Sequence, residues 1–285
     1  TRDLVSMSTE QITSFSTSQV ASLTGSQITA LFTNQVAAMT TDQIGAIETA
    51  DLAVMTNNQL QALTTDQVEV LGTDQLRALT NTQMGGLLSA QLRTLSSEQL
   101  NAFTSTQFNA LSGAQIATIT TGQVENLSTS LVPNLSNGVV AAFTNEQVAA
   151  LTTDQIVALT TAQVASGLTT TQIATFTTDA IAAMETSDVA ALTTRLVAAL
   201  TTAGVAALTT EQVAFGLTTR QIVVLSTANV AALETQDVAV LRTVQVAALT
   251  TTQLNEGFTT GQIQALSTQQ LAALSSVQIV DGLRT

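Results

Sequence analysis

The sequence predicts an all-α solenoid, a superhelix of about 35 very short capped helices with one helix in each octapeptide repeat. Three observations predict it: an apolar residue recurs every eight residues, most repeats open with Ser or Thr followed three residues later by Gln, and acidic residues gather near that opening. We number each repeat from its leading residue, usually Leu, as position 1. One continuous helix is excluded, because at about 100° per residue the apolar stripe would rotate by roughly 80° in each repeat.

Positions 1 and 6 are the candidate core. Position 6 is apolar in all 35 repeats, from Leu4 to Ile279, and the following position 1 is Leu, Phe, Met or Ile from Met7 to Leu283. A helix of about one and a half turns is not stable alone in water, so neighbouring repeats must bury these positions together. We expect two short helices in each layer of the solenoid.

The opening of each repeat has the pattern of a capping box. Position 2 is Ser or Thr in 27 of 35 repeats and position 5 is Gln in 25. The hydroxyl can accept from the third helical N–H while the Gln accepts from the N–H of the cap residue. We expect each Gln to serve its own helix start; a stacked row of amides available for self-association is the alternative. Representative capping pairs are Thr64 with Gln67, Ser96 with Gln99, and Thr152 with Gln155.

Charge placement favours helices over strands. Sixteen of the twenty acidic residues fall at positions 2 to 5, where the amino terminus of a helix stabilises negative charge. The alternative is a β-solenoid, because three repeats make a coil of 24 residues and Thr, Val and Ile suit strands. Strict alternation of apolar and polar residues is missing, however, and the frequent Ala-Ala pairs favour helix.

The array reads as a single domain over residues 1–285, with two kinds of interruption. The only Pro of the chain, Pro133, falls within an expected helix and predicts a bend at 127–139. Repeats in 164–285 contain an extra Gly before position 1, namely Gly167, Gly216, Gly257 and Gly282.

Three repeats replace the capping pair with Glu-Thr-x-Asp. When position 5 becomes Asp, position 2 becomes Glu, and we expect the cap to move one residue later. A pair of carboxylates is also a weak candidate for a metal site, although no third ligand or His accompanies it. The residues are Glu48 and Asp51, Glu185 and Asp188, and Glu234 and Asp237.

The composition argues against an enzyme. The chain has no Cys, His, Trp, Tyr or Lys and carries a formal charge of −13. We therefore identify no catalytic or cofactor-binding residue and expect no cofactor. Seven scattered Arg cannot form the basic patch that nucleic acids or anionic membranes require, and no apolar run is long enough for membrane insertion.

The repeats resemble a known kind of array. Leu151–Ala158 (LTTDQIVA), Leu159–Ser166 (LTTAQVAS) and Leu63–Val70 (LTTDQVEV) look like the LTTxQ[VI]xA octapeptide arrays of large proteobacterial secreted or cell-surface proteins. The resemblance extends over essentially the whole chain. It implies an extracellular or cell-surface location and a surface, matrix or filament role, and it supplies no catalytic residues.

The sequence therefore predicts a non-enzymatic extracellular structural protein: an elongated fibre or filament subunit, a sheath component or an adhesin stalk. Self-association, head to tail or lateral, is expected because a solenoid exposes the apolar faces of its end repeats. Truncation from a longer array is the alternative explanation of the uncapped ends. The alternative function is a binding solenoid that recognises a protein or glycan, for which Phe32 and Phe215 lie outside core positions. An ice-binding Thr array is a third interpretation.

Overall fold

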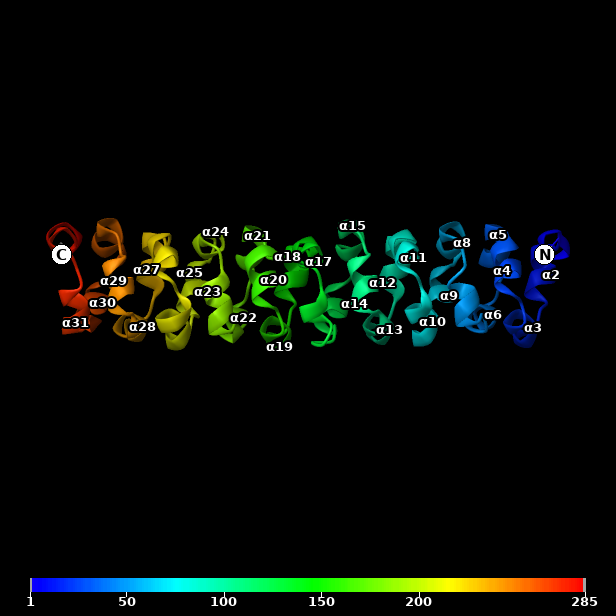
Figure 1. The fold of residues 1–285 in the computed structure, drawn as a ribbon, viewed down its shortest axis with the longest axis horizontal. Coiled ribbons are helices and arrows are strands. Elements are labelled where there is room, and N and C mark those ends of the chain that lie inside the picture. The colour runs from blue at the N-terminus through cyan, green and yellow to red at the C-terminus, as the bar shows by residue number, and fades with distance from the viewer. Residues whose placement is uncertain (1, 284–285) are drawn as a thin grey trace. The chain divides into compact units, whose positions relative to one another are not determined.

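The computed structural model describes residues 2–283, and within that range it contains short helices and no strand (Figure 1). The prediction of an all-α repeat solenoid is confirmed, and the β-solenoid alternative is wrong. The chain divides into two compact units, one ending at Phe143 and the other beginning at Thr144.

The first unit is a succession of helices of four to six residues that includes one 3₁₀ turn, η1. Its elements are α1 (Arg2–Val5), α2 (Thr9–Thr13), α3 (Thr17–Ala21), α4 (Gly25–Ala30), α5 (Thr33–Ala38), α6 (Thr41–Gly45), α7 (Thr49–Leu52), α8 (Asn57–Ala62), α9 (Thr65–Glu69), α10 (Thr73–Ala78), α11 (Asn81–Gly86), α12 (Ser89–Thr94), α13 (Ser97–Ala102), α14 (Ser105–Asn109), α15 (Gly113–Ile116), α16 (Thr121–Glu125), η1 (Val132–Asn134) and α17 (Asn137–Ala142).

The second unit has the same construction and includes three π-helical turns, η2 to η4. Its elements are α18 (Asn145–Ala149), α19 (Thr153–Val157), α20 (Thr161–Ser166), α21 (Thr170–Ile173), α22 (Thr178–Ala183), α23 (Thr186–Ala191), α24 (Thr194–Ala198), α25 (Thr202–Ala206), η2 (Gln212–Gly216), α26 (Thr219–Val223), α27 (Thr227–Ala232), α28 (Thr235–Val240), α29 (Thr243–Ala247), η3 (Gln253–Gly257), α30 (Thr260–Ala265), α31 (Thr268–Ala272) and η4 (Gln278–Gly282).

Each α-helix from α2 to α31 starts at position 3, directly after the position 2 residue at its cap. In α9, Thr64 is extended with φ −68° and ψ 164°, and its hydroxyl accepts from the N–H of Gln67. Position 1 is also extended, with Leu63 at φ −61° and ψ 130°. These two residues break the helix and change the direction of the chain, so every repeat contributes one separate helix.

Helices three apart in the chain pack against one another. In the first unit α2 contacts α5, α5 contacts α8 and α8 contacts α11, and Figure 1 shows α5, α8 and α11 side by side. In the second unit α20 contacts α23 in the same way. A superhelical turn therefore takes between three and four repeats, and the expectation of two helices in a layer is wrong. The direction change at positions 1 and 2 sets this number, and the apolar pattern alone does not reveal it.

The interior of the coil is made of positions 1 and 6. Every position 6 side chain from Leu4 to Leu254 is buried, and most position 1 side chains are buried with them. The exceptions at position 6 are Ile263, Leu271 and Ile279 in the last turn, where no further turn covers them within the described residues. Turn-to-turn burial thus supplies the stability that an isolated short helix lacks.

Three of the four inserted glycines, Gly216, Gly257 and Gly282, end π-helical turns, whereas Gly167 follows the α-helix α20. The N–H of Leu217 donates to the carbonyl of Gln212 at 2.9 Å, and that of Phe258 donates to Gln253 at 3.0 Å, each across five residues. No glycine of the described residues has a positive φ, so backbone conformation does not require Gly here. Close packing against the preceding turn does require Gly at position 216. A Cβ on Gly216 would lie 3.0 Å from Val189 Cβ and 3.2 Å from the Thr186 carbonyl oxygen.

Gly216→Ala should therefore destabilise the protein, by about 1–3 kcal/mol, because the methyl group would overpack against Val189 of the preceding turn. Gly122→Ala is the matched control, since a Cβ there meets nothing within 4 Å and Gly122 lies inside α16. That control should stabilise the protein by about 0.5–1 kcal/mol through helix propensity. Urea unfolding measures the change in the free energy of unfolding of each variant. Equal changes in the two variants would contradict the packing argument.

Pro133 replaces an α-helix with the 3₁₀ turn η1. Leu131, Val132 and Leu135 remain buried, so the core positions of this repeat are kept although its helix is lost. The missing Gln of this repeat and of the next is compensated from elsewhere, as the hydrogen bonds below show. The bend predicted at 127–139 and the single array over 1–285 stay predictions.

Candidate functional site

The most frequent buried polar group is the Gln at position 5. Gln67 is 2% exposed, and its Oε1 accepts from the N–H of Thr64 at 2.8 Å. Its Nε2 donates to the carbonyl oxygens of Val36 at 3.2 Å and Met39 at 2.6 Å, both in the preceding superhelical turn. One amide thus caps its own helix and donates to carbonyls at the end of an earlier helix, where the Val36 carbonyl also accepts from the Met39 N–H at 3.2 Å.

The pattern recurs along both units. Ser96 and Gln99 form the same reciprocal bonds at 2.8 and 3.1 Å, and Thr152 and Gln155 form them at 2.9 and 3.2 Å. Gln99 Nε2 also donates to the carbonyl of Leu71 at 2.9 Å. The expectation that each Gln serves only its own cap was incomplete. The alternative of a surface row of stacked amides is wrong for these buried glutamines, because their partners are main-chain carbonyls.

Two asparagines replace glutamines that are missing near Pro133. Ser128 and Ser136 begin repeats without Gln, and their N–H groups donate to Oδ1 of Asn101 at 2.8 Å and of Asn109 at 2.7 Å. Both asparagines sit at position 7, four repeats earlier. Sequence reasoning missed them, although the occurrence of Asn at position 7 four repeats before each lost Gln is a signal that could have identified them.

The three Glu-Thr-x-Asp repeats keep the ordinary helix start. Helices α7, α23 and α28 begin at the Thr, with Glu48, Glu185 and Glu234 at the cap position, so the expected shift of the cap is wrong. The reason is that Asp takes over the role of the Gln oxygen: Asp237 Oδ2 accepts from the N–H of Glu234 at 3.0 Å. The structure thus places each pair within one repeat.

Two of these aspartates are buried with one oxygen unsatisfied. Asp188 and Asp237 are each 1% exposed, and Oδ2 of Asp188 and Oδ1 of Asp237 have no hydrogen-bond partner among residues 2–283. Burial raises the pKa of Asp188 to about 6, the charge of Glu185 adds to the rise, and the Glu185 N–H opposes it. Burial likewise raises the pKa of Asp237, against the Glu234 N–H. Asp51 is only half-buried.

No metal centre emerges from these carboxylates. The described residues contain no group of three or more acidic, His or Cys side chains that could hold a metal ion. Each Glu–Asp pair remains a two-carboxylate motif, so Glu48, Asp51, Glu185, Asp188, Glu234 and Asp237 have no third side-chain ligand of that kind within residues 2–283.

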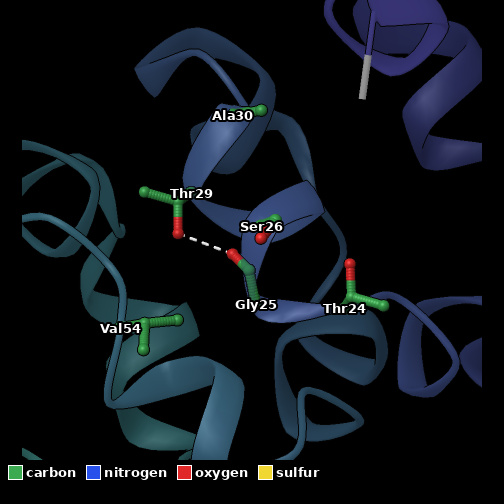
Figure 2. Close-up of a pocket in the computed structure, with 6 residues that line it drawn as sticks. All are labelled: Thr24, Gly25, Ser26, Thr29, Ala30 and Val54. Atoms are coloured by element: carbon green, nitrogen blue, oxygen red, sulfur yellow. Dashed lines mark hydrogen bonds between the residues drawn. The ribbon is translucent and has the colours of Figure 1, made fainter.

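One hollow on the surface of the first unit is open to solvent and is lined by small and polar side chains. Figure 2 shows Thr24, Gly25, Ser26, Thr29, Ala30 and Val54 around it, with the Thr29 hydroxyl donating to the Gly25 carbonyl at 2.5 Å. Its lining includes no acid and no base. Elsewhere on the surface Phe32 is 55% and Phe215 is 67% exposed, whereas Phe108 is buried. No helix within residues 2–283 is both long and apolar enough to cross a membrane.

Most of the acidic side chains lie on the outside of the coil. The position 4 carboxylates are exposed, and the helix start stabilises the charge of Glu146: its own N–H and the Thr144 hydroxyl lower its pKa. The position 4 acids are Glu10, Asp42, Asp66, Asp74, Glu98, Glu146, Asp154, Asp179 and Glu211.

Comparison with known proteins identifies the repeat. No curated protein matches the chain. Among solved structures, the leucine-rich repeat-containing protein LegL7 from Legionella pneumophila matches with 10% sequence identity and a TM-score of 0.21, over 85% of this chain and 83% of that one. The model of the ALTTAQ repeat matches residues 1–33, 44–81, 82–113, 132–161, 140–178, 181–215 and 230–263. These segments make up well over half of the chain, which therefore belongs to the ALTTAQ repeat family.

Proposed function

We propose that this protein is a non-enzymatic structural element of the cell surface or extracellular space, a fibre subunit, sheath component or stalk that associates with copies of itself end to end. The observation that carries the proposal is the turn-to-turn interface, which repeats within each unit and is left open, within residues 2–283, on the outer faces of the first and last turns. A second copy offers the same chemistry on each face.

The first turn presents hydrogen-bond donors. Gln11 and Gln19 are exposed and Gln27 is half-buried, whereas Gln35, the first with a preceding turn, is buried. Oε1 of Gln11, Gln19 and Gln27 accepts from the N–H of its own cap at 2.8 Å. Their Nε2 groups have no acceptor within residues 2–283, so three amides are available to a further turn.

The last turn presents the complementary acceptors and apolar surface. The row of amides ends with Gln278, which donates to the carbonyl of Leu249 at 2.6 Å. The next three position 1 carbonyls, those of Phe258, Leu266 and Leu274, receive no hydrogen bond from residues 2–283. Leu271 and Ile279 at position 6 are exposed beside them. Three donors on one face therefore match three acceptors on the other, in the spacing used inside the coil.

Other features support a structural role. The glutamines, the position 2 hydroxyls and the core side chains are all used to build the coil, and the acidic row on the outside favours solubility of a long assembly. A location outside the cell agrees with a chain that has no Cys and no Lys.

Exchanging Gln11, Gln19 and Gln27 for Glu should abolish or weaken concentration-dependent assembly of the protein. Glu keeps the oxygen that caps each helix and replaces the donor with an acceptor, which would face the carbonyls of the incoming copy. Sedimentation velocity over a range of concentrations, followed by negative-stain imaging, measures the assembly. We expect end-to-end oligomers of the native chain and monomers of the variant at the same concentration.

The control is the triple variant N34D/N58D/N81D, which adds the same three charges at exposed Asn side chains on the outside of the first unit. It should assemble like the native chain. A native chain that stays monomeric at high concentration, or equal loss of assembly in both variants, would overturn end-to-end association through these amides.

A further inference from the structure

Asp188 and Asp237 stand at position 5, where most repeats carry the side-chain amide of Gln or Asn. Two such amides in this part of the coil donate to the preceding turn: Asn229 Nδ2 donates to the carbonyl of Leu200 at 3.0 Å, and Gln221 Nε2 donates to that of Leu192 at 2.7 Å. A carboxylate has no proton to donate. The two buried aspartates, when ionised, therefore lack the donor that these amides supply.

The acceptors that they face can be assigned from the register. Both Asn229 and Gln221 reach a carbonyl 29 residues earlier, because an inserted Gly lies between donor and acceptor. Asp188 and Asp237 also follow an inserted Gly, and the same offset gives the carbonyls of Leu159 and Leu208. Neither carbonyl receives a hydrogen bond from any residue in 2–283.

Each buried aspartate thus brings an unsatisfied oxygen to an unsatisfied carbonyl. Two acceptors cannot satisfy each other, and leaving both buried without a partner is costly. A single proton on the carboxyl satisfies both groups at once, because a carboxylic acid donates its O–H to the carbonyl as Asn229 donates its N–H. The other carboxyl oxygen continues to accept from the cap N–H, as Asp237 does from Glu234.

We propose that Asp188 and Asp237 are held in the folded coil as neutral carboxylic acids that hydrogen-bond the carbonyls of Leu159 and Leu208, so that the second unit is strengthened by mild acid and weakened at neutral pH. The two residues are equivalent members of one block: they are 49 residues apart, as are the inserted Gly167 and Gly216. The same arrangement of a buried Asp and an opposing carbonyl therefore occurs twice in the second unit.

No cation lies in the elements packed against them. Asp188 on α23 packs against α20 and η2, and Asp237 on α28 packs against η2 and α30, none of which contains a charged residue. The acceptor for Asp188 follows α19, whose only charge is the exposed Asp154, and α25, which precedes Leu208, has none. The nearby charges named with the pKa shifts, Glu185 and Glu234, are negative and favour protonation.

The third copy of the motif provides a natural control. Asp51 is half-buried, and a Cβ on Gly25 would lie 3.2 Å from its Oδ1. The open hollow of Figure 2 is lined by Gly25 and Val54, so solvent lies close to this carboxyl and can hydrate it. Replacement of Asp51 by Asn therefore removes the carboxylate of the same motif at a site that is open to solvent, which makes it the control for the two buried sites.

The direction of the pH effect follows from linkage. The folded-state pKa of Asp188, about 6, lies above its ordinary value of 3.8, so the folded protein holds the extra proton between these values. The stabilisation is fully present below pH 3.8 and is lost as the pH rises through about 6. Over this interval Asp188 alone should raise the unfolding equilibrium constant of the second unit by roughly a hundredfold.

The test compares the full chain with the variants D188N/D237N and D51N, by thermal unfolding from pH 4 to 8 and by carbon NMR titration of the labelled Asp carboxyls. D188N/D237N should match the native chain near pH 4 and unfold at a higher temperature above pH 6, because Asn donates at every pH. Two Asp carboxyl signals, absent from D188N/D237N, should titrate above those of the other aspartates. D51N should follow the native pH profile.

Three results would overturn the proposal. One is a native pH profile that persists in D188N/D237N. Another is titration of both carboxyls together with the exposed acids. The third is a rise in the native unfolding temperature on adding Na⁺ or Ca²⁺ at pH 7.5 that D188N/D237N abolishes, because an ion would then take the place assigned to the proton. The reverse exchange, N229D, should add a further pH-dependent loss of stability, and its failure to do so would also count against the proposal.

Discussion

Gln67→Ala should destabilise the first unit by about 3 kcal/mol, far more than loss of a helix cap alone. The substitution removes the bond from the Thr64 N–H and all three bonds from Nε2 to the preceding turn. It leaves the buried carbonyl of Met39 without its partner, and an unsatisfied buried acceptor costs about 1–3 kcal/mol by itself. Urea unfolding and hydrogen exchange of α5 and α9 amides would measure the loss.

Gln19→Ala is the matched control, because Gln19 makes the same cap and has no preceding turn. Its Oε1 accepts from the Ser16 N–H at 2.8 Å, as Gln67 does from Thr64, but the side chain is exposed and Nε2 has no acceptor within residues 2–283. It should cost about 1 kcal/mol. The difference between the two variants isolates the bonds between turns. Equal losses would mean that the glutamines act only as caps.

This comparison also shows how far local sequence patterns reach. The capping box joins residues three apart, so the Ser or Thr at position 2 and the Gln at position 5 identify it directly. The second role of the same Gln joins residues 28 and 31 apart, as Gln67 with Met39 and Val36. Nothing within one repeat marks those partners, because every residue accepts through an identical main-chain carbonyl.

The number of repeats in a turn was not predictable for a related reason. Positions 1 and 6 identify the buried stripe of each helix, and an apolar stripe is compatible with several angles between successive helices. The extended conformation of residues such as Leu63 and Thr64 sets that angle. Once the turn is known, the position of Asn109 opposite Ser136 and the absence of a side chain at Gly216 both become understandable.

The protonation of the buried aspartates was also not predictable from residues close to them in the sequence. The sequence singled out Asp188 and Asp237 as exceptions and raised a metal site, because two acids in one repeat suggest ligands. Their burial and the carbonyls opposite them are long-range properties of the coil. A buried carboxyl at a place where an amide otherwise donates a hydrogen bond indicates that the carboxyl itself carries a proton.

Phe108→Ala should give the largest loss among single core substitutions of the first unit, about 3–5 kcal/mol. Phe108 is fully buried on α14, and its ring packs edge to face against Phe103 with centroids 6.3 Å apart and planes at 64°. Most position 6 residues are aliphatic, so the neighbouring turns are shaped around a larger side chain here and cannot close the cavity without moving. Urea unfolding would show a lower midpoint, with amides of α11, α14 and α17 losing protection first, because helices three apart share the damaged core.

Phe215→Ala is the control for loss of an aromatic ring outside the core. Phe215 is 67% exposed on η2, and its removal should change the free energy of unfolding by less than about 0.5 kcal/mol. A nearest-neighbour coil also predicts where the damage from Phe108→Ala stops, since each turn contacts only the turns beside it. Amides of α2 and α3, several turns away, should keep their protection near the midpoint of the local transition. Simultaneous loss of protection throughout the first unit would show that the unit unfolds as a single cooperative block and that stability is not assembled turn by turn.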